Sequence, residues 1–483
     1  MVYDVLYSSI KRYPENTALE DVHSKITYRE LGNLVVNFAD RLRSLGFRSG
    51  EKVLIWFSNS IEFVTAYFGI NLAGGIVVLA DTKLNHELLG VISENSLKWI
   101  VTDSVGAEKL KGLVNSPDFK GGSSLKVILA EDKGFFQQQD NSCNKSFMFP
   151  EDANPDSIST ILYTSGSSGK PKAVVNSHRT LEEAIINYTD TLNVTSVDRF
   201  IAVTPFFHSY AFGSCMLAAI SRGAALLVHS VFQPRKILKS IASQKATFFH
   251  GVPYMYSLLT DILEHEKYEL TSVRCFISAG GPLDKDISKR FYSATGRLIH
   301  QEYGSSETGT IAVNLSEDLH KNLDSVGRPL KNVAIRAIDV NSDGNTLLQV
   351  KSKGMSLGYL NTEAFERDWY TTGDIVELDE DGYIHITGRY NRLINISGLK
   401  VNPVEVEALI MEHPLVVDVK VSGKSHGDYG EIVEAEVIRK NDTLTQNELI
   451  KFCQKKLALF KVPKIINWVD FIPKSGTGKN INL

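Results

Sequence analysis

Hydrophobic positions in the first part of the chain alternate between helical and strand periodicity. Residues 31–45 and 61–73 have helical spacing, and the short apolar run 52–57 between them predicts a strand. A strongly apolar run at 158–163 predicts a further strand, and the Gln- and Asn-rich stretch 133–146 predicts a surface loop. Helices and strands that alternate in this way predict parallel sheets covered by helices.

The pattern changes near residue 390, after which a compact α+β unit is expected. Its predicted elements are a capped helix over 402–413, strands over 416–421 and 431–438, a helix capped by Thr445 with Glu448, and a strand over 465–472. We therefore expect an N-terminal domain over residues 1–390 and a C-terminal domain over residues 391–483 that can move relative to it.

Composition and charge exclude several classes of protein. The 483 residues are 43% hydrophobic and 22% charged, which is typical of globular proteins. A net charge of -4 gives no electrostatic basis for binding nucleic acid or an anionic membrane. The four cysteines lack metal-binding spacing, the start lacks the order of a signal peptide, and the apolar stretch 66–80 is too short to span a membrane. We expect a cytoplasmic protein without a membrane span.

The segment Y-T-S-G-S-S-G-K-P-K at 163–172 is the most informative motif in the chain. Its glycines allow backbone N–H groups to turn toward an anion, so it predicts a phosphate-binding loop. A Walker-type loop needs Ser or Thr directly after the lysine and then a helix, whereas Pro171 follows Lys170 and a strand is expected next. The predicted context is strand, loop, strand, and an exposed Gly/Ser hairpin is the alternative.

This segment resembles the phosphate-binding signature of the adenylate-forming superfamily, which comprises acyl- and aryl-CoA ligases, luciferases and peptide-synthetase adenylation domains. Five later segments resemble the superfamily in the expected order: S-A-G-G-P-L at 278–283, E-Y-G-S-S-E-T-G at 302–309, Y-T-T-G-D at 370–374, G-R-Y-N-R at 388–392 and P-K-S-G-T-G-K at 473–479. The resemblance implies an α/β fold: a large N-terminal domain of helix-covered, mostly parallel sheets plus a small β subdomain, and a small mobile α+β C-terminal domain.

The resemblance also implies ATP-driven activation of a carboxylate. Attack of the acid on the ATP α-phosphate gives an acyl adenylate and pyrophosphate, a reaction that depends on positioned cations and donors. Glu307 is expected to help hold Mg²⁺ with Thr164 beside it, and Asp374 to bind both ribose hydroxyls. The nucleotide-binding residues implied are Thr164, Ser165, Gly166, Ser167, Ser168, Gly169, Lys170, Gly280, Gly281, Pro282, Glu302, Tyr303, Gly304, Ser306, Asp374, Arg389 and Lys479.

Lys479 is the catalytic cation that the resemblance implies, with Glu307, Thr164 and Arg389 completing the catalytic set. Its Gly-flanked loop could carry a long ammonium side chain into the main site. Asn391 aligns with the pivot between domains, where relatives often carry Asp or Lys; Asn tolerates unusual backbone dihedrals and so suits a hinge. Read in isolation, Glu307 and Lys479 would be solvated surface charges.

Residues 204–213 resemble the segment that borders the acyl pocket. Peptide-synthetase domains for α-amino acids carry an Asp where this chain has Ser209, so an α-amino acid is disfavoured. The aromatic residues near 206–212 and 248–254 either line a flat apolar cavity or belong to the core. An aryl or arylacrylic acid is the leading substrate class, followed by a medium- or long-chain fatty acid. The expected pocket residues are His208, Ser209, Phe212, Phe249, Gly251, Gly280 and Gly304.

For the second step, residues 396–407 resemble the CoA-ligase form of a motif whose loop, here at Gly398, lines the pantetheine tunnel after domain rotation. The thiol is expected to come from CoA or from a phosphopantetheinylated acyl carrier protein, with CoA favoured. A luciferase-like oxygenase and a non-catalytic acyl-binding protein are alternatives on the same scaffold. A kinase is disfavoured because the loop lacks the required helix.

Overall fold

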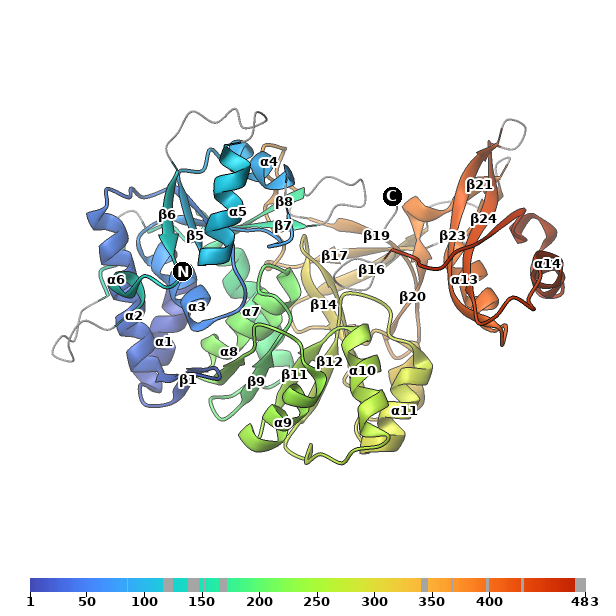
Figure 1. Cartoon of the computed structure of the whole chain (residues 1–483), viewed down its shortest axis with the longest axis horizontal. Helices are drawn as coiled ribbons and strands as arrows, with labels where there is room; N and C mark the ends of the chain where they lie inside the picture. The colour runs from blue at the N-terminus through green and yellow to red at the C-terminus, as the bar shows by residue number, and fades with distance from the viewer. Residues whose placement is uncertain are drawn as a thin grey trace.

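Four β-sheets organise the chain, and helices cover the faces of the two largest (Figure 1). The computed structural model describes residues 1–84, 86–115, 125–137, 147–150, 153–164, 172–339, 346–365, 368–396, 399–426 and 430–473.

The largest sheet has nine strands. They are β1 (Thr17–Glu20), β2 (Lys25–Thr27), β9 (Arg199–Ala202), β10 (Ala225–Val228), β11 (Phe248–Gly251), β12 (Cys275–Ser278), β13 (Ile299–Ser305), β14 (Gly309–Val313) and β15 (Arg328–Pro329). The six strands β1, β10, β9, β11, β12 and β13 are parallel, whereas β2 at one edge and β14 and β15 at the other are antiparallel. The carboxyl ends of the central strands therefore lie at one edge of the sheet, where ligands of α/β proteins bind.

A second large sheet has seven strands. They are β3 (Lys52–Ile55), β4 (Ile76–Leu79), β5 (Trp99–Thr102), β6 (Lys126–Leu129), β7 (Ile158–Thr164), β8 (Lys172–Ser177) and β18 (Gly358–Tyr359). Its central strands are parallel, but β7 and β8 are antiparallel and flank residues 165–171. The predicted strand, loop, strand context of the phosphate segment is thereby confirmed.

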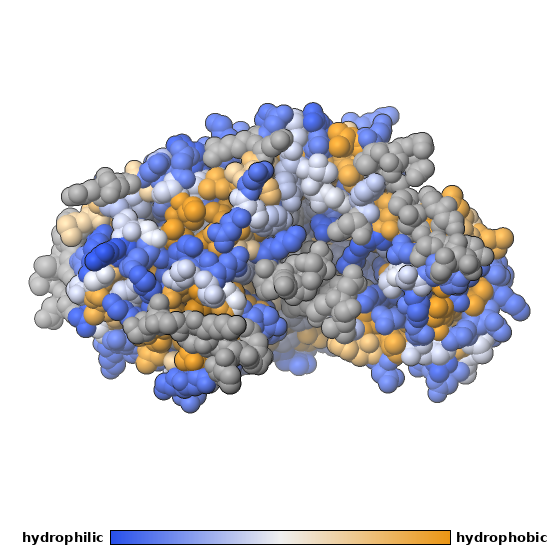
Figure 2. Space-filling view, turned by 90° about the horizontal axis from the view of Figure 1, so that it is seen from above, coloured by the Kyte–Doolittle hydropathy of each residue, from blue (hydrophilic) through white to orange (hydrophobic). Residues whose placement is uncertain are grey.

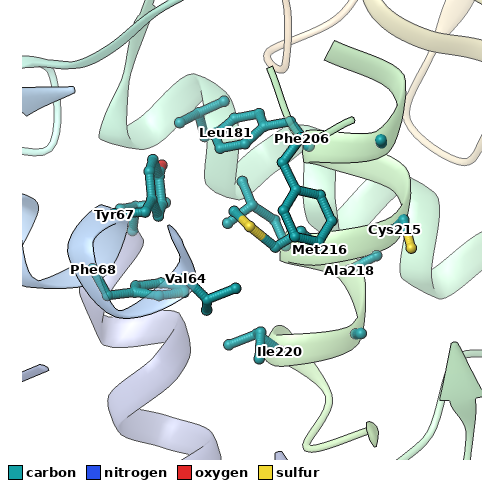
Figure 3. Packing of buried hydrophobic residues seen from close by; sticks show 14 of the residues in the cluster. Val64, Tyr67, Phe68, Leu181, Phe206, Cys215, Met216, Ala218 and Ile220 are labelled. Carbon is teal, nitrogen blue, oxygen red and sulfur yellow. The ribbon is translucent and has the colours of Figure 1, made fainter. Parts of the chain in front are cut away.

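A layer of helices packs between these two sheets. The helices are α1 (Val2–Arg12), α2 (Tyr28–Ser44), α3 (Ile61–Leu72), α7 (His178–Thr191), the π-helix η1 (Ala211–Leu217) and α8 (Ala218–Ser221). The main buried cluster joins them to strand residues of both sheets, such as Leu162 and Phe248. Figure 3 shows Val64 of α3 lying beside Met216 of η1 within this layer. The helices therefore connect the two sheets through one hydrophobic core.

Side chains of the nine-stranded sheet alternate between this inner layer and the outer face. Phe248 and Ile277 belong to the inner cluster, whereas their chain neighbours Phe249 and Phe276 belong to a cluster on the outer face. The outer face is covered by α9 (Pro234–Gln244), α10 (Pro253–Leu263) and α11 (Lys285–Thr295). Helices α4 (His86–Glu94) and α5 (Ser104–Val114) cover the outer face of the seven-stranded sheet. The predicted helix-covered, mostly parallel sheets are confirmed.

The two smaller sheets follow in the last third of the chain. The first is antiparallel, in the order β16 (Ala334–Asp339), β17 (Thr346–Lys351), β19 (Tyr370–Leu378) and β20 (Ile384–Arg389). The second contains β21 (Ile394–Ile396), β22 (Leu399–Val401), β23 (Val416–His426), β24 (Gly430–Arg439) and β25 (Ile465–Trp468), and it packs on α13 (Pro403–Met411) and α14 (Gln446–Gln454). The short elements are α6 (Lys133–Phe136), α12 (Leu319–Asp324), η2 (Tyr390–Arg392) and η3 (Leu459–Lys461). The C-terminal sheet has a hydrophobic cluster of its own.

Local capping signals predicted both C-terminal helix starts correctly. The Asn402 side chain accepts a hydrogen bond from the Val404 backbone, and Thr445 forms a reciprocal capping box with Glu448. The first of these helices ends at Met411, two residues before the predicted end.

The prediction of a continuous surface loop over 133–146 was wrong at its start. Lys133–Phe136 forms a helical turn, because the Asp132 side chain accepts a hydrogen bond from the Gly134 backbone and Phe135 is buried. The ring of Phe135 lies 5.1 Å from that of Phe38 between centroids, so this segment contributes to the core. The remaining residues from 138 to 146 lie outside the described part of the chain.

Candidate active site

The turn between β13 and β14 carries the predicted Y-G-S-S-E-T segment at the edge of the nine-stranded sheet. A Cβ at Gly304 would lie 2.3 Å from the carbonyl oxygen of Gly309, so only glycine fits there. Gly309 has a φ of +65°, and the buried Thr308 hydroxyl accepts a hydrogen bond from the Ser305 backbone. These features fold the segment back sharply and present Ser306 and Glu307 at the turn.

Asp374 is the centre of a first polar cluster. It follows Gly373, whose φ is +77°, and its side chain is 7% exposed. The Tyr303 hydroxyl donates to one Asp374 oxygen at 2.6 Å, and the Arg389 Nε donates to the other at 2.6 Å. Burial raises the pKa of Tyr303, and the charge of Asp374 raises it further, so this hydroxyl stays a donor. The structure thus brings together three predicted nucleotide-binding residues from β13, β19 and β20.

Glu307 lies close to this cluster. The Tyr359 hydroxyl donates to a Glu307 oxygen at 2.7 Å. Burial lowers the pKa of Arg389, but the hydrogen bond and charge of Asp374, with smaller contributions from Tyr303 and Glu307, raise it overall. The charges of Glu307 and Asp374 therefore both act on the Arg389 guanidinium, with Asp374 in direct contact.

The base of the predicted phosphate loop lies on the same side of the molecule. Thr164 and Lys172 face each other across the β7–β8 pair, and the Thr164 hydroxyl donates to the Lys172 carbonyl at 3.4 Å. The Lys172 ammonium lies 5.1 Å from the centre of the Tyr359 ring, whose hydroxyl binds Glu307. Thr164 and Glu307, the predicted Mg²⁺ ligands, are thus linked by contacts through Lys172 and Tyr359.

The described residues contain no cluster of three or more His, Cys, Asp or Glu side chains that could hold a metal ion by themselves. One carboxylate with a hydroxyl nearby fits a Mg²⁺ ion that takes most of its oxygens from phosphates and water. Glu307 is half-buried, and only one donor to its side chain is found among the described residues, so it can still provide an oxygen ligand.

Residues 204–213, the predicted acyl segment, contact the turn between β13 and β14. The Ser209 hydroxyl lies 2.9 Å from that of Ser306, and His208 and Ser209 are both half-buried. Burial lowers the pKa of His208, which favours its neutral form. The loop after β12 contributes Gly280, whose φ is +86°, and the partly exposed Gly281 and Pro282. The contact of Ser209 with Ser306 thus joins the predicted acyl segment to the turn that carries Glu307.

Three predicted pocket residues are buried, and their role in an acid pocket stays a prediction. Phe212 is 1% exposed and packs edge-on against Tyr67, and Phe249 is fully buried on the outer face against Tyr256. Gly251 is required by packing, because a Cβ there would lie 2.8 Å from the Phe249 ring. Of the two open interpretations of the aromatic residues, the core interpretation applies to Phe212 and Phe249.

Glu302, whose predicted nucleotide-binding role stays a prediction, points away from Asp374. It is 8% exposed and points into the inter-sheet layer, where the hydroxyls of Ser214 and Thr310 each donate to its Oε1 at 2.6 Å. Adjacent strand residues point to opposite sides, so Tyr303 reaches Asp374 while Glu302 cannot. Sequence analysis did not identify Ser214 or Thr310, and the only signal was a lone hydroxyl residue within an apolar helical run.

Several predicted residues lie outside the described part of the chain: Ser165, Gly166, Ser167, Ser168, Gly169, Lys170, Gly398 and Lys479. The backbone of Asn391 lies in η2, between the antiparallel sheet and the C-terminal sheet. Seen from above, the surface is hollowed between the larger part of the molecule and the C-terminal part, with polar and apolar residues interspersed (Figure 2).

Comparison with known families identifies this arrangement. The family described as AMP-binding enzyme matches residues 6–360, and the AMP-binding enzyme C-terminal domain matches residues 405–479. The chain belongs to the AMP-binding enzyme family. The predicted membership of the adenylate-forming superfamily, and with it an ATP-dependent, AMP-forming ligase, is confirmed.

Relatives of this AMP-binding enzyme cover nearly its whole length. A 2-succinylbenzoate–CoA ligase from Geobacillus sp. (strain WCH70) is 29% identical, over 96% of this chain and 93% of its own. ATP-bound MatB from Rhodopseudomonas palustris has a TM-score of 0.87 at 27% identity, covering 99% of this chain and 97% of its own.

The o-succinylbenzoate CoA synthetase of Bacillus subtilis, in complex with its acyl-adenylate intermediate, has a TM-score of 0.84 at 25% identity, covering 99% of this chain and 96% of its own. Ligation of an acid to CoA is thus an activity found among the relatives of this AMP-binding enzyme.

In the described ranges of this AMP-binding enzyme, every helix is too short or too polar to cross a membrane. The cytoplasmic location stays a prediction.

Proposed function

We propose that this AMP-binding enzyme is an acid–thiol ligase that converts a carboxylic acid and ATP to an acyl adenylate and then transfers the acyl group to the pantetheine thiol of CoA. The observation that carries the proposal is the convergence of Asp374, Arg389, Tyr303 and Glu307 beside the base of the 165–171 segment. Relatives that bind ATP or an acyl adenylate support it.

The first step needs charge neutralisation more than covalent chemistry. The acid oxygen attacks the α-phosphate, the bond to pyrophosphate breaks, and negative charge develops on the transferring group. Arg389 can offer its guanidinium to phosphate oxygens while remaining held by Asp374, because a guanidinium has five N–H donors. The predicted loop residues from Ser165 to Lys170 and the predicted cation Lys479 would supply the remaining donors.

Asp374 is suited to the ribose. Each of its oxygens already accepts one short hydrogen bond, and each retains a lone pair for one hydroxyl of a vicinal diol. Tyr303 and Arg389 fix the orientation of the carboxylate. Mg²⁺ at Glu307 and Thr164 would neutralise the charge of the leaving pyrophosphate.

The second step requires a change in the site. We propose that residues 391–483 form a separate domain that rotates about Asn391 and brings the Gly398 loop to a pantetheine tunnel. The separate hydrophobic cluster of the C-terminal sheet supports this division, as does the separate family match of residues 405–479. CoA is the proposed acceptor because the compared relatives are CoA ligases, and a carrier protein is the alternative acceptor.

For the acid, an aryl or arylacrylic compound is the proposed class. The relatives that act on 2-succinylbenzoate support an aromatic acid, and the half-buried rings of His208 and Tyr210 border the approach to Ser209. A medium- or long-chain fatty acid is the second class.

A panel of carboxylic acids assayed by ATP–pyrophosphate exchange tests the proposal. We expect acid-dependent exchange and AMP formation, with a mass of acyl-CoA that appears only when CoA is added. A thioester formed only on a phosphopantetheinylated protein would replace CoA as the acceptor. The proposal fails if no acid supports exchange, if ADP is the product, or if light and oxygen consumption accompany the adenylate.

A further inference from the structure

Strand β20 has an irregular pairing just before the C-terminal unit, residues 391–483. It lies at the end of the antiparallel sheet, next to β19. Consecutive residues of β19, Ile375 and Val376, pair with Gly388 and Ile386 of β20, so Thr387 is a bulged residue without a partner in this ladder. The backbone groups of a bulge need partners from elsewhere in the molecule.

The side chain of Asn402 bonds to the bulged residue. Its Nδ2 donates to the Thr387 carbonyl at 2.7 Å. Its Oδ1 accepts from the Val404 backbone at 3.1 Å and caps α13. Because the carbonyl needs a donor and the Val404 N–H needs an acceptor, both ends of the amide are matched. One side chain thus joins β20 to the first turn of α13, which packs beside it (Figure 1).

Gly388 leaves the space for this contact. The three atoms nearest to a Cβ built at Gly388 all belong to Asn402, and the closest of them, Nδ2, would lie 2.4 Å away. The φ of Gly388 is not positive, so its backbone does not require glycine. An alanine at position 388 would therefore displace the Asn402 side chain from Thr387.

The hydrogen bond between Thr387 and Asn402 spans the proposed pivot. Thr387 lies before Asn391 and Asn402 lies after it, and the two bonded residues are 15 positions apart. The backbone of Asn402 is fixed in the C-terminal unit, because it directly follows Val401, a fully buried member of the C-terminal cluster. Rotation of this unit about Asn391 must therefore break the bond.

We propose that Asn402 is a positioning residue that holds the C-terminal unit against β20 for the first step and must release it for the second. This inference rests on the proposed two-step function. In the arrangement seen here, β20 also carries Arg389 in its ion pair with Asp374, and the second step is proposed to follow rotation. Each half-reaction depends on the population of its own arrangement, so loss of the bond should raise the rate of the second relative to the first.

The variant Asn402→Asp tests the inference in the full-length enzyme. Aspartate keeps the size of the side chain and the oxygen that caps α13, but it has no N–H for the Thr387 carbonyl. Single-turnover rates are measured for adenylate formation from ATP, and for thioester formation from added acyl adenylate and CoA, with the acid that gives the fastest exchange. We expect the ratio of the second rate to the first to rise about 5-fold or more, because a carbonyl loses its donor.

Gly388→Ala should produce the same change from the other side of the contact. Both variants break one bond, so the double variant should raise the ratio no further than either single variant. Asn441→Asp is the matched control, since Asn441 is an exposed asparagine of the C-terminal unit whose oxygen also accepts from a backbone N–H two residues later. The ratio should be unchanged in this control.

Trypsin cleavage after Arg392 gives a readout that needs no substrate. Arg392 is exposed and lies between Thr387 and Asn402 along the chain, where cleavage requires local opening. Loss of the bond should make this cleavage about 5-fold faster or more in Asn402→Asp. Asn441→Asp should be cleaved at the wild-type rate.

Each outcome supports or overturns one statement. A ratio that is unchanged or lower in Asn402→Asp overturns the inference and leaves the proposed function standing. An equal rise in Asn441→Asp also overturns it, because the added charge alone would then explain the effect. If Gly388→Ala does not fold, Asn402→Asp and its control decide. Absence of exchange with every acid contradicts the proposed function and the assignment to half-reactions, and the cleavage rates then decide whether Asn402 holds the two parts together.

Discussion

Two buried carboxyl groups at strand β13 have opposite surroundings. Asp374 contacts Tyr303 of this strand, and Glu302 is the residue before Tyr303. Asp374 accepts from Tyr303 and is paired with Arg389, so its orientation is fixed. In the described ranges, Glu302 has neutral hydroxyls as its hydrogen-bonding neighbours, those of Ser214, Thr310 and Tyr188. Among the described residues, the carboxylate of the predicted nucleotide cluster is thus paired with a cation, whereas the carboxyl group in the inter-sheet layer has neutral partners.

The comparison also separates a site that always binds the same ligand, the nucleotide, from a buried position within the inter-sheet layer. A nucleotide site that serves one ligand benefits from a preorganised, ionised acceptor. Substitutions at the two positions should therefore change different properties, nucleotide kinetics at Asp374 and stability at Glu302.

The largest effect is expected at the nucleotide side from Lys479→Ala. The loss of a cation that neutralises the transition state should reduce acid-dependent pyrophosphate exchange by about 10³-fold or more while sparing thioester formation from added acyl adenylate. Exchange and thioester formation are measured separately, with Lys451→Ala as a control at an exposed lysine of α14. Loss of both half-reactions, or of neither, would refute the role of Lys479.

Asp374→Asn should remove the ion pair between Asp374 and Arg389. The amide loses the charge that holds Arg389 and cannot accept from both ribose hydroxyls, so the KM for ATP should rise about 10- to 100-fold with a smaller change in the KM for the acid. Tyr303→Phe, which removes one of the two donors, should produce a smaller rise in the same direction. An equal rise of both KM values would assign Asp374 to general stability instead.

Glu302→Gln should change the pH dependence of the free energy of unfolding, because Glu302 is a buried carboxyl group. Since the pKa of Glu302 rises from 4.5 to about 7 on folding, wild-type stability falls as pH rises from about 4.5 to about 7 and is level above that range. Glutamine does not titrate, so the variant should gain on the wild type across this range, reaching about 3 kcal/mol above pH 7. Urea unfolding at pH 4.5 and pH 8 measures the gain, and an equal difference at both values would contradict it.

The smallest effect is expected for Tyr359→Phe. Glu307 loses the hydrogen bond of the Tyr359 hydroxyl, while its carboxylate keeps its charge and position in the turn. The loss of one such bond corresponds to about 0.5 to 1.5 kcal/mol, or roughly a 2- to 12-fold lower kcat/KM for ATP. Titration of the rate with Mg²⁺ gives the matching readout, because a higher Mg²⁺ requirement is expected if Glu307 holds the ion. An unchanged Mg²⁺ requirement would show that the Tyr359 hydroxyl does not contribute to the proposed metal site.

The sequence predicted the sheets and the nucleotide side of the site better than the acid side. The segments around Tyr303, Asp374 and Arg389 are contiguous and have a fixed order along the chain, so each could be found by itself. Capping signals such as Thr445 with Glu448 are equally local, and they placed a helix correctly.

The sequence alone could not show which side of an element a residue faces. Glu302 was assigned to the nucleotide because it adjoins Tyr303, yet alternation along β13 turns the two in different directions. Phe249 and its neighbour His250 likewise face opposite sides of the sheet. The contact of Ser214 with Glu302 joins residues 88 positions apart, and only the packing of η1 against β13 determines it.

Transfer of oxygen from the acid to AMP tests the central claim most directly. The enzyme would be incubated with ATP, CoA and a substrate acid labelled with ¹⁸O in its carboxylate, and AMP and acyl-CoA would be analysed by mass spectrometry. The account predicts one ¹⁸O atom in each AMP formed, because a carboxylate oxygen stays on the α-phosphate when the thiol displaces AMP. Unlabelled AMP, or ¹⁸O in inorganic phosphate with ADP as the nucleotide product, would contradict it.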